Sequence, residues 1–277
     1  MRCERLICSD CMTPASVGFQ CPSCVKQGAA TIRQPKAVYG GRSVAAPTVT
    51  FALIGLNVIM FLVTTGTGTG LAFGGNPSSV FNKLALIPAT HQAHYAFPPS
   101  YGQGVAEGGY YRLLTATFLH YGIVHIALNM YCLFLLGPAL ESAFGRLRFL
   151  GIYLISGLSG SALTYLLGSP SEQAAGASGA IFGLFAAFFV VQRRRGGDVS
   201  QIALTIGINL FLSFGLSSFI DWRGHVGGLI GGALVSAALV YPPEGRRRWV
   251  LQAAGSVLVL VLVLVVVVVR TAALRSS

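Results

Sequence analysis

The chain has 277 residues, of which 53% are hydrophobic and only 10% are charged, and its mean hydropathy is +0.68. A soluble domain carries about 25% charged residues, so this composition excludes a water-soluble globule and equally a disordered chain. At about 20 apolar residues per membrane span, it predicts an all-α polytopic membrane protein. The net charge is +11, but the basic residues cluster between apolar stretches, which indicates membrane topology and no nucleic-acid partner.

Four segments follow one another along the chain. Residues 1–28 form a polar, cysteine-rich head, residues 29–46 a linker, residues 47–241 a six-span core, and residues 242–277 a seventh span with a tail. The expected spans are the apolar runs at about 48–65, 114–137, 149–168, 178–192, 201–219, 224–241 and 249–269. The aromatic segment of about 66–112 is expected at the bilayer interface. The last run is apolar on all sides, which predicts a peripheral, lipid-facing helix.

The distribution of basic residues predicts the orientation in the membrane. With seven spans and a cytoplasmic N-terminus, 14 of the 19 basic residues lie on the inner side. The remaining 5 are Lys83, Arg112, Arg223, Arg270 and Arg275. Because basic residues are enriched on the cytoplasmic side, we expect the N-terminus inside and the C-terminus outside.

The head carries two pairs of cysteines, Cys8-x2-Cys11 and Cys21-x2-Cys24, separated by nine residues. Two such pairs can supply the four sulfur ligands of a structural Zn²⁺ site, and the metal would supply the folding energy of so short a segment. Disulfides are the alternative, but the expected cytoplasmic side is reducing. Cys3 belongs to neither pair.

Polar residues inside membrane spans are costly and suggest functional sites. The fourth run opens with Ser178 in the sequence Gly176-Ala177-Ser178-Gly179-Ala180. Glycines leave the Ser178 hydroxyl uncrowded, and a helix N-terminus offers free N–H groups to a developing oxyanion. Small residues in membrane helices also serve purely for packing, so this motif alone does not decide between catalysis and packing.

The sixth run has His225 near its start, among glycines spaced four residues apart at Gly224, Gly228 and Gly232. This spacing predicts close packing against another helix with a small-residue face. The fourth run has such a face at Gly179 and Gly183, which are also four residues apart. Packed together, the two runs bring a histidine and a serine to the same depth.

A histidine within reach of a serine can act as its general base, although a lone buried histidine is otherwise a satisfied core residue. No Asp or Glu lies where it would orient His225 from inside the bundle. The sequence therefore favours a Ser–His dyad of Ser178 and His225. Asp221, at the membrane boundary, is the alternative third member.

The second run contains His120-x4-His125-x3-Asn129. His125 and Asn129 are four residues apart and share one helix face. Both side chains can donate hydrogen bonds, as a half of an oxyanion hole requires. His120 lies nearer the outer end and is expected to anchor the long loop.

These motifs, in this order and spacing, resemble the rhomboid family of intramembrane serine proteases over about residues 47–241. The resemblance implies a rhomboid-like six-helix core with an added seventh helix and no cofactor for catalysis. It implies that Ser178 is the nucleophile and His225 the general base. It also implies that the backbone N–H of Ser178, with His125 and Asn129, stabilises the oxyanion.

The resemblance extends to supporting residues. Tyr111-Arg112 stands where the family usually has Trp-Arg, and Phe182 stands where an aromatic ring often stacks on the catalytic histidine. Gly176 and Gly179 flank the nucleophile. The head resembles zinc-binding heads of some bacterial rhomboids, which implies a multi-pass protein of the bacterial plasma membrane.

The implied function is endopeptidase cleavage of transmembrane or juxtamembrane segments of single-span membrane proteins in the lipid bilayer, with the head docking a cytoplasmic partner. One alternative is a catalytically inactive rhomboid-like protein that binds membrane helices. A transporter and a membrane-tethered binding module built on the head are further alternatives. Inverted repeats, which would favour a transporter, are not clear in the sequence.

Overall fold

The computed structural model describes residues 7–31, 37–42, 44–65, 78–92, 95–217 and 220–276, so Cys3 lies outside the described residues. The chain is an all-α protein that divides into two compact units, Met1–Lys36 and Ala37–Ser277. The division falls inside the expected linker, 29–46. Ala37 and Tyr39 are buried in the second unit, so the last part of that segment already belongs to the helical bundle.

The N-terminal unit is small and built around a hairpin. A 3-10 turn, η1 (Ser9–Cys11), leads into strands β1 (Thr13–Pro14) and β2 (Phe19–Gln20), and helix α1 (Pro22–Thr31) follows. The strands are antiparallel, with Thr13 opposite Gln20. Gly18, at a φ of +72°, makes the turn between them.

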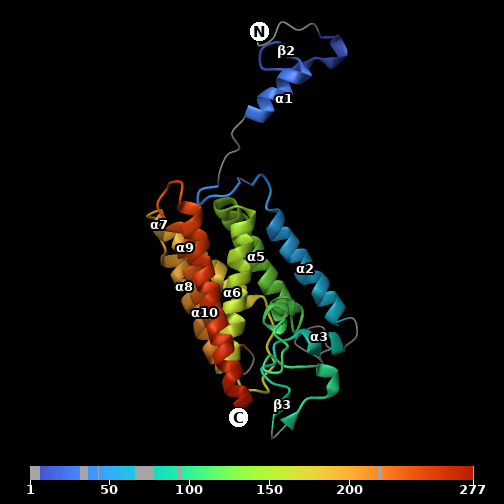
Figure 1. Cartoon of the computed structure of the whole chain (residues 1–277), viewed down its shortest axis with the longest axis vertical. Helices are drawn as coiled ribbons and strands as arrows, with labels where there is room; N and C mark the ends of the chain where they lie inside the picture. The colour runs from blue at the N-terminus through green and yellow to red at the C-terminus, as the bar shows by residue number, and fades with distance from the viewer. Residues whose placement is uncertain are drawn as a thin grey trace. The chain divides into compact units, whose positions relative to one another are not determined.

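In the part of the chain that the structure describes, seven long helices form the body of the second unit (Figure 1). They are α2 (Thr48–Thr65), α5 (Ile123–Phe144), α6 (Arg146–Leu167), α7 (Ser178–Arg194), α8 (Ser200–Gly215), α9 (Trp222–Val240) and α10 (Arg248–Ser276). Each expected apolar run corresponds to one of them. Within the described residues, five are long and apolar enough to cross a membrane. The other two, α7 and α8, have only 17 and 16 residues.

The expected bounds of the second span, 114–137, were wrong. Its first residues form two short turns, α4 (Arg112–Thr115) and η3 (Ala116–Phe118), and the chain is extended at Gly122 before α5 begins. Ala116 and Leu119 are buried within the protein, so the apolar character of this segment reflects burial there and not a membrane span. At the other end α5 continues through Pro138 to Phe144.

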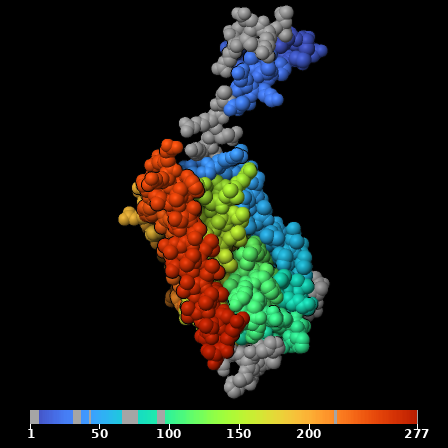
Figure 2. Space-filling model, viewed as in Figure 1, coloured from blue at the N-terminus to red at the C-terminus, as the bar shows by residue number. Residues whose placement is uncertain are grey.

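Helix α10 is peripheral, as its uniform hydrophobicity indicated. Figure 2 shows it along the outside of the bundle, and only four of its residues are buried: Gln252, Val259, Val267 and Thr271. Gln252 fixes it in place by donating to the backbone oxygens of Tyr39 and Leu239 at 2.9 and 2.7 Å. It also accepts hydrogen bonds from Arg148 of α6.

Helices α7 and α9 pack against each other at the centre of the bundle, and their backbones are in direct contact. A β-carbon on Gly228 would overlap the carbonyl oxygen of Gly179, and one on Gly232 would overlap the backbone of Gly183. The predicted packing of these two glycine faces is therefore confirmed. Because no side chain fits between them, the two helices approach as closely as helices can.

The second glycine face of α9 packs on α6. Both Gly227 and Gly231 lie against Ser159, whose hydroxyl donates to its own helix at Ile155. Helices α6, α7 and α9 thus form one closely packed unit.

The segment from Ser78 to Phe118 folds at one end of this bundle, here called the loop end. It includes α3 (Ser79–Leu84), β3 (His91–Gln92), β4 (Tyr95–Ala96) and η2 (Pro99–Tyr101). The guanidinium of Arg112, fully buried, holds this segment together. It donates to the backbone oxygens of Asn82, Ala85, Tyr101 and Gln103.

Replacing Gly228 by alanine should destabilise the bundle, because the added methyl meets the α7 backbone and overpacking costs about 1–3 kcal/mol. We expect a thermal midpoint about 5 °C lower in detergent. Gly207→Ala on α8, where a β-carbon would meet nothing within 4 Å, is the matched control and should not lower it. Equal midpoints for the two variants would contradict the close α7–α9 contact.

Arg112→Gln should also lower the thermal midpoint, because carbonyl oxygens of the loop lose their charged donor. Hydrogen bonds to charged groups are worth about 1.5–3 kcal/mol each, so we expect a fall of about 5–10 °C. Arg146→Gln, at an exposed arginine, should leave the midpoint unchanged. An unaffected Arg112→Gln protein would show that the loop folds without this cation.

Candidate active site

Three residues singled out from the sequence lie in the first turns of three helices at the loop end. His125 is the third residue of α5, Ser178 the first of α7 and His225 the fourth of α9. The helices alternate in direction, so these three N-termini share one end of the bundle (Figure 1). The structure thus brings the predicted site residues to the same depth.

Ser178 and His225 flank a contact between the ends of α7 and α9. A β-carbon on Gly179 would lie 3.0 Å from the carbonyl oxygen of Gly224, so the backbones next to the two residues touch. The ring of His225 stacks on Phe182, with centroids 4.2 Å apart and planes at 15°. Phe182 lies one turn beyond Ser178 on α7, and its predicted stacking on His225 is confirmed.

His225 is buried, and its Nδ1 lies 2.7 Å from the hydroxyl of Ser213 on α8. Sequence reasoning missed Ser213. It is the only polar residue between Asn209 and Ser217, which was the available signal. The sequence does not indicate whether such a serine faces the lipid or the neighbouring helix.

The carboxylate of Asp221 is engaged away from His225. It caps α9 by accepting from the backbone N–H of Arg223 at 3.1 Å, and it accepts a short hydrogen bond from Thr164 of α6. Burial raises the pKa of Asp221, and the hydrogen bond from Thr164 opposes this effect. The side chain that contacts the ring of His225 at Nδ1 is Ser213 and not Asp221.

His125 and Ser178 both lie close to Gly176. The backbone N–H of Tyr121 points at Nδ1 of His125 at 3.4 Å, so the neutral ring carries its proton on Nε2. A β-carbon on Gly176, at a φ of +150°, would lie 3.0 Å from this Nε2 and 3.4 Å from Oγ of Ser178. A side chain at this position would fill the space between His125 and Ser178, and glycine leaves it open.

Asn129 follows one turn later on the same face of α5. It is buried, and its amide donates to the backbone oxygen of His125 at 2.8 Å. This bond holds the amide against its own helix, one turn beyond His125.

His120 precedes α5 and does not lie in the second span, because the chain enters the helix only after Gly122. It is buried, and among the described residues neither ring nitrogen has a hydrogen-bond partner. Its edge contacts the ring of His125, with centroids 5.0 Å apart. Burial and the neighbouring His125 lower the pKa of His120 to about 3, so it packs as a neutral ring.

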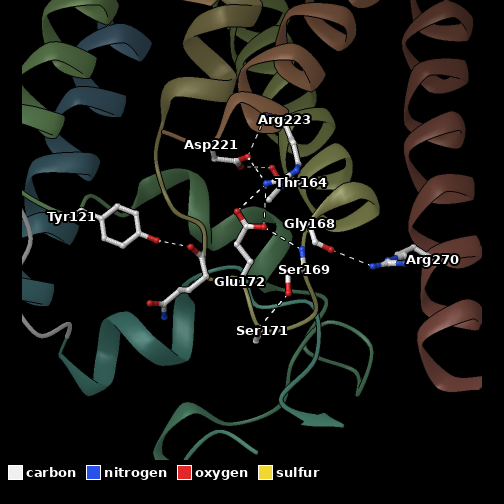
Figure 3. Close-up of polar contacts among 10 residues, drawn as sticks. Tyr121, Thr164, Gly168, Ser169, Ser171, Glu172, Asp221, Arg223 and Arg270 are labelled. Carbon is white, nitrogen blue, oxygen red and sulfur yellow. Dashed lines mark hydrogen bonds and ion pairs between the residues drawn. The ribbon is translucent and has the colours of Figure 1, made fainter. Parts of the chain in front are cut away.

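A network of polar contacts holds the segment that leads into Ser178 (Figure 3). Glu172 pairs with Arg223 of α9 at 2.8 Å and accepts from the backbone N–H of Ser169. Tyr121 donates to the backbone oxygen of Gln173 at 2.8 Å. The start of α7 is thereby tied to α9 and to the segment that precedes α5.

The four predicted zinc ligands all lie in the described part of the head. The thiols of Cys8 and Cys11 hydrogen-bond each other, which lowers the pKa of Cys8, and the backbone N–H of Cys24 points at Sγ of Cys21 at 3.3 Å. Among the described residues, however, no three His, Cys, Asp or Glu side chains are grouped so as to hold a metal ion.

Comparison with known proteins gives a match to the Rhomboid domain model over residues 107–242. The chain is 36% identical to the rhomboid protease GluP of Bacillus subtilis, over 72% of this chain and 36% of that protein. It is 39% identical to the putative rhomboid protease YdcA of the same organism, over 53% of this chain and 75% of that protein. RHOMBOID-like protein 7 of Arabidopsis thaliana is 34% identical, over 52% of this chain and 48% of that protein.

The chain therefore spans about a third of GluP and about half of the plant relative, but three quarters of YdcA. The matched region contains every helix-borne residue of the candidate site, from His125 to His225. By these likenesses and by its helical, multi-pass architecture, the chain belongs to the rhomboid family.

Proposed function

We propose that the chain is an intramembrane serine endopeptidase that cleaves transmembrane or juxtamembrane segments of single-span membrane proteins. One observation carries this proposal. Ser178 and His225 lie in the first turns of two helices whose backbones touch at Gly179 and Gly224, with the His225 ring stacked on Phe182 one turn from the serine. This placement supports the proposal, because serine hydrolysis requires a base near the nucleophile.

In the proposed reaction, Nε2 of His225 takes the proton of the Ser178 hydroxyl while Oγ attacks the scissile carbonyl carbon. The C–N bond then breaks, and His225 returns the proton to the leaving amine. A water molecule, deprotonated by His225, attacks the acyl-enzyme and releases the second product with Ser178 restored.

The negative oxygen of each tetrahedral intermediate needs donors. The backbone N–H of Ser178 at the start of α7 supplies one, and Nε2–H of His125, across the space left by Gly176, supplies another. Asn129 is the third proposed donor. Removing one such donor typically costs about 10²–10³ in rate, so the loss of Asn129 should weaken activity without abolishing it.

The length of α7 supports a site below the membrane surface. Its 17 residues extend about 26 Å, which is less than the hydrocarbon thickness of about 30 Å. With the N-terminus cytoplasmic and the C-terminus outside, the loop end faces the exterior of a bacterial plasma membrane. A substrate helix would have to unwind there, since a regular helix hides its amide bonds.

A fluorophosphonate probe tests the nucleophile directly. In detergent it should label the unmodified protein, whereas Ser178→Ala should show no labelling and His225→Ala strongly reduced labelling. Ser171→Ala, which removes an exposed serine from the loop before α7, should label normally. Equal labelling of all four proteins would contradict the hydrolase proposal and favour an inactive, helix-binding rhomboid-like protein.

Our second proposal is that the head binds a structural Zn²⁺ through Cys8, Cys11, Cys21 and Cys24 and docks a cytoplasmic partner. The antiparallel pairing of Thr13 with Gln20 supports this proposal. Cys11 lies two residues before Thr13, and Cys21 directly follows Gln20, so one cysteine of each pair lies at the same end of the hairpin. Binding of the metal would have to draw the two pairs together.

Metal analysis of protein purified under reducing conditions should find about one zinc per chain, as a four-thiolate site requires. The variant that carries both Cys8→Ser and Cys21→Ser should lose it, whereas Cys132→Ser in α5 should retain it. A metal-free unmodified protein would refute the zinc proposal and leave the membrane site unaffected.

A further inference from the structure

The two nitrogens of His225 cannot exchange roles in the proposed reaction. A neutral imidazole carries one proton, and the nitrogen that takes the proton of Ser178 must be the unprotonated one. If Nε2 is the base, Nδ1 must carry the proton. A group that accepts a hydrogen bond from Nδ1 would keep the ring in this state.

Ser213 of α8 occupies the required place, with its Oγ 2.7 Å from Nδ1 of His225. Burial distinguishes Ser213 from the other residues of α8. It is the only buried residue of α8, all 16 residues of which the structure describes. Burying a hydroxyl is unfavourable unless it is hydrogen-bonded, so helix packing alone does not explain a serine here.

The direction of the hydrogen bond follows from the second partner of Ser213. Its hydroxyl donates to the backbone oxygen of Asn209 at 2.6 Å, and a carbonyl oxygen can only accept. The single hydroxyl proton is thereby used. Oγ of Ser213 is left as an acceptor, so the proton between the two side chains belongs to Nδ1 of His225.

We propose that Ser213 is a positioning residue that holds His225 with its proton on Nδ1 and its Nε2 lone pair available to Ser178. The proposal deepens the proposed peptidase function and rests on it. Stacking on Phe182 fixes the plane of the ring, and the bond to Ser213 fixes its rotation within that plane. Together they determine which nitrogen is presented to the nucleophile.

Cleavage kinetics of the full chain in proteoliposomes, with a single-span substrate, provide the first test. Ser213→Ala should lower kcat about tenfold, as expected for the loss of one hydrogen bond, with KM unchanged. Ser213→Thr should restore kcat, because threonine on α8 makes the same backbone bond, as Thr205 does to Gln201 at 2.9 Å. Thr205→Ala, at a partly exposed site, is the matched control and should retain full activity.

Nitrogen-15 NMR of histidine-labelled protein provides the second test and needs no activity. The resonances of His225, assigned with His225→Gln, should show the proton on Nδ1, and Ser213→Ala should shift the population toward Nε2–H. A proton on Nε2 in the unmodified protein, or a tautomer unchanged by Ser213→Ala, would overturn the proposal. An unmodified protein without activity but with the Nδ1–H tautomer would refute the peptidase function and leave the positioning contact standing.

Discussion

The backbone contact between α7 and α9 is the constraint on which the rest of the structure depends. Gly179 and Gly183 of one helix meet Gly228 and Gly232 of the other with no side chain between them. Such a contact leaves little freedom in the distance between the helix axes. A residue at the start of α7 and one at the start of α9 are consequently held at a fixed separation. The Arg112-centred loop and the Glu172–Arg223 pair then enclose that end.

The same packing gives the two histidines of the site opposite chemical characters. The backbone N–H of Tyr121 points at Nδ1 of His125, which places the proton on Nε2 and makes it a donor. Ser213 accepts at Nδ1 of His225, which leaves Nε2 as an acceptor. One imidazole is suited to stabilise negative charge and the other to remove a proton. The partner of Nδ1, and not the residue type, decides between these roles.

Patterns that depend on local spacing were predictable from the sequence. The apolar runs located the seven long helices of the bundle, the glycine spacing identified the α7–α9 contact, and the position of Phe182 indicated its stacking on His225. Features that depend on contacts between residues distant in the sequence could not be predicted. Hydrophobicity did not distinguish a buried loop from a span, so α5 was expected to begin too early. The backbone acceptors of Arg112 and the direction of the Ser213 side chain arise only when the chain is folded.

The proposed joint action of Ser178 and His225 on a peptide bond depends on this geometry. Its most direct test is mass-spectrometric mapping of a single-span substrate incubated with the full chain in proteoliposomes. We expect one cut in or beside the substrate's transmembrane segment, absent with Ser178→Ala and with His225→Ala. A cut that persists in both variants, or an intact substrate with the unmodified protein, would contradict it.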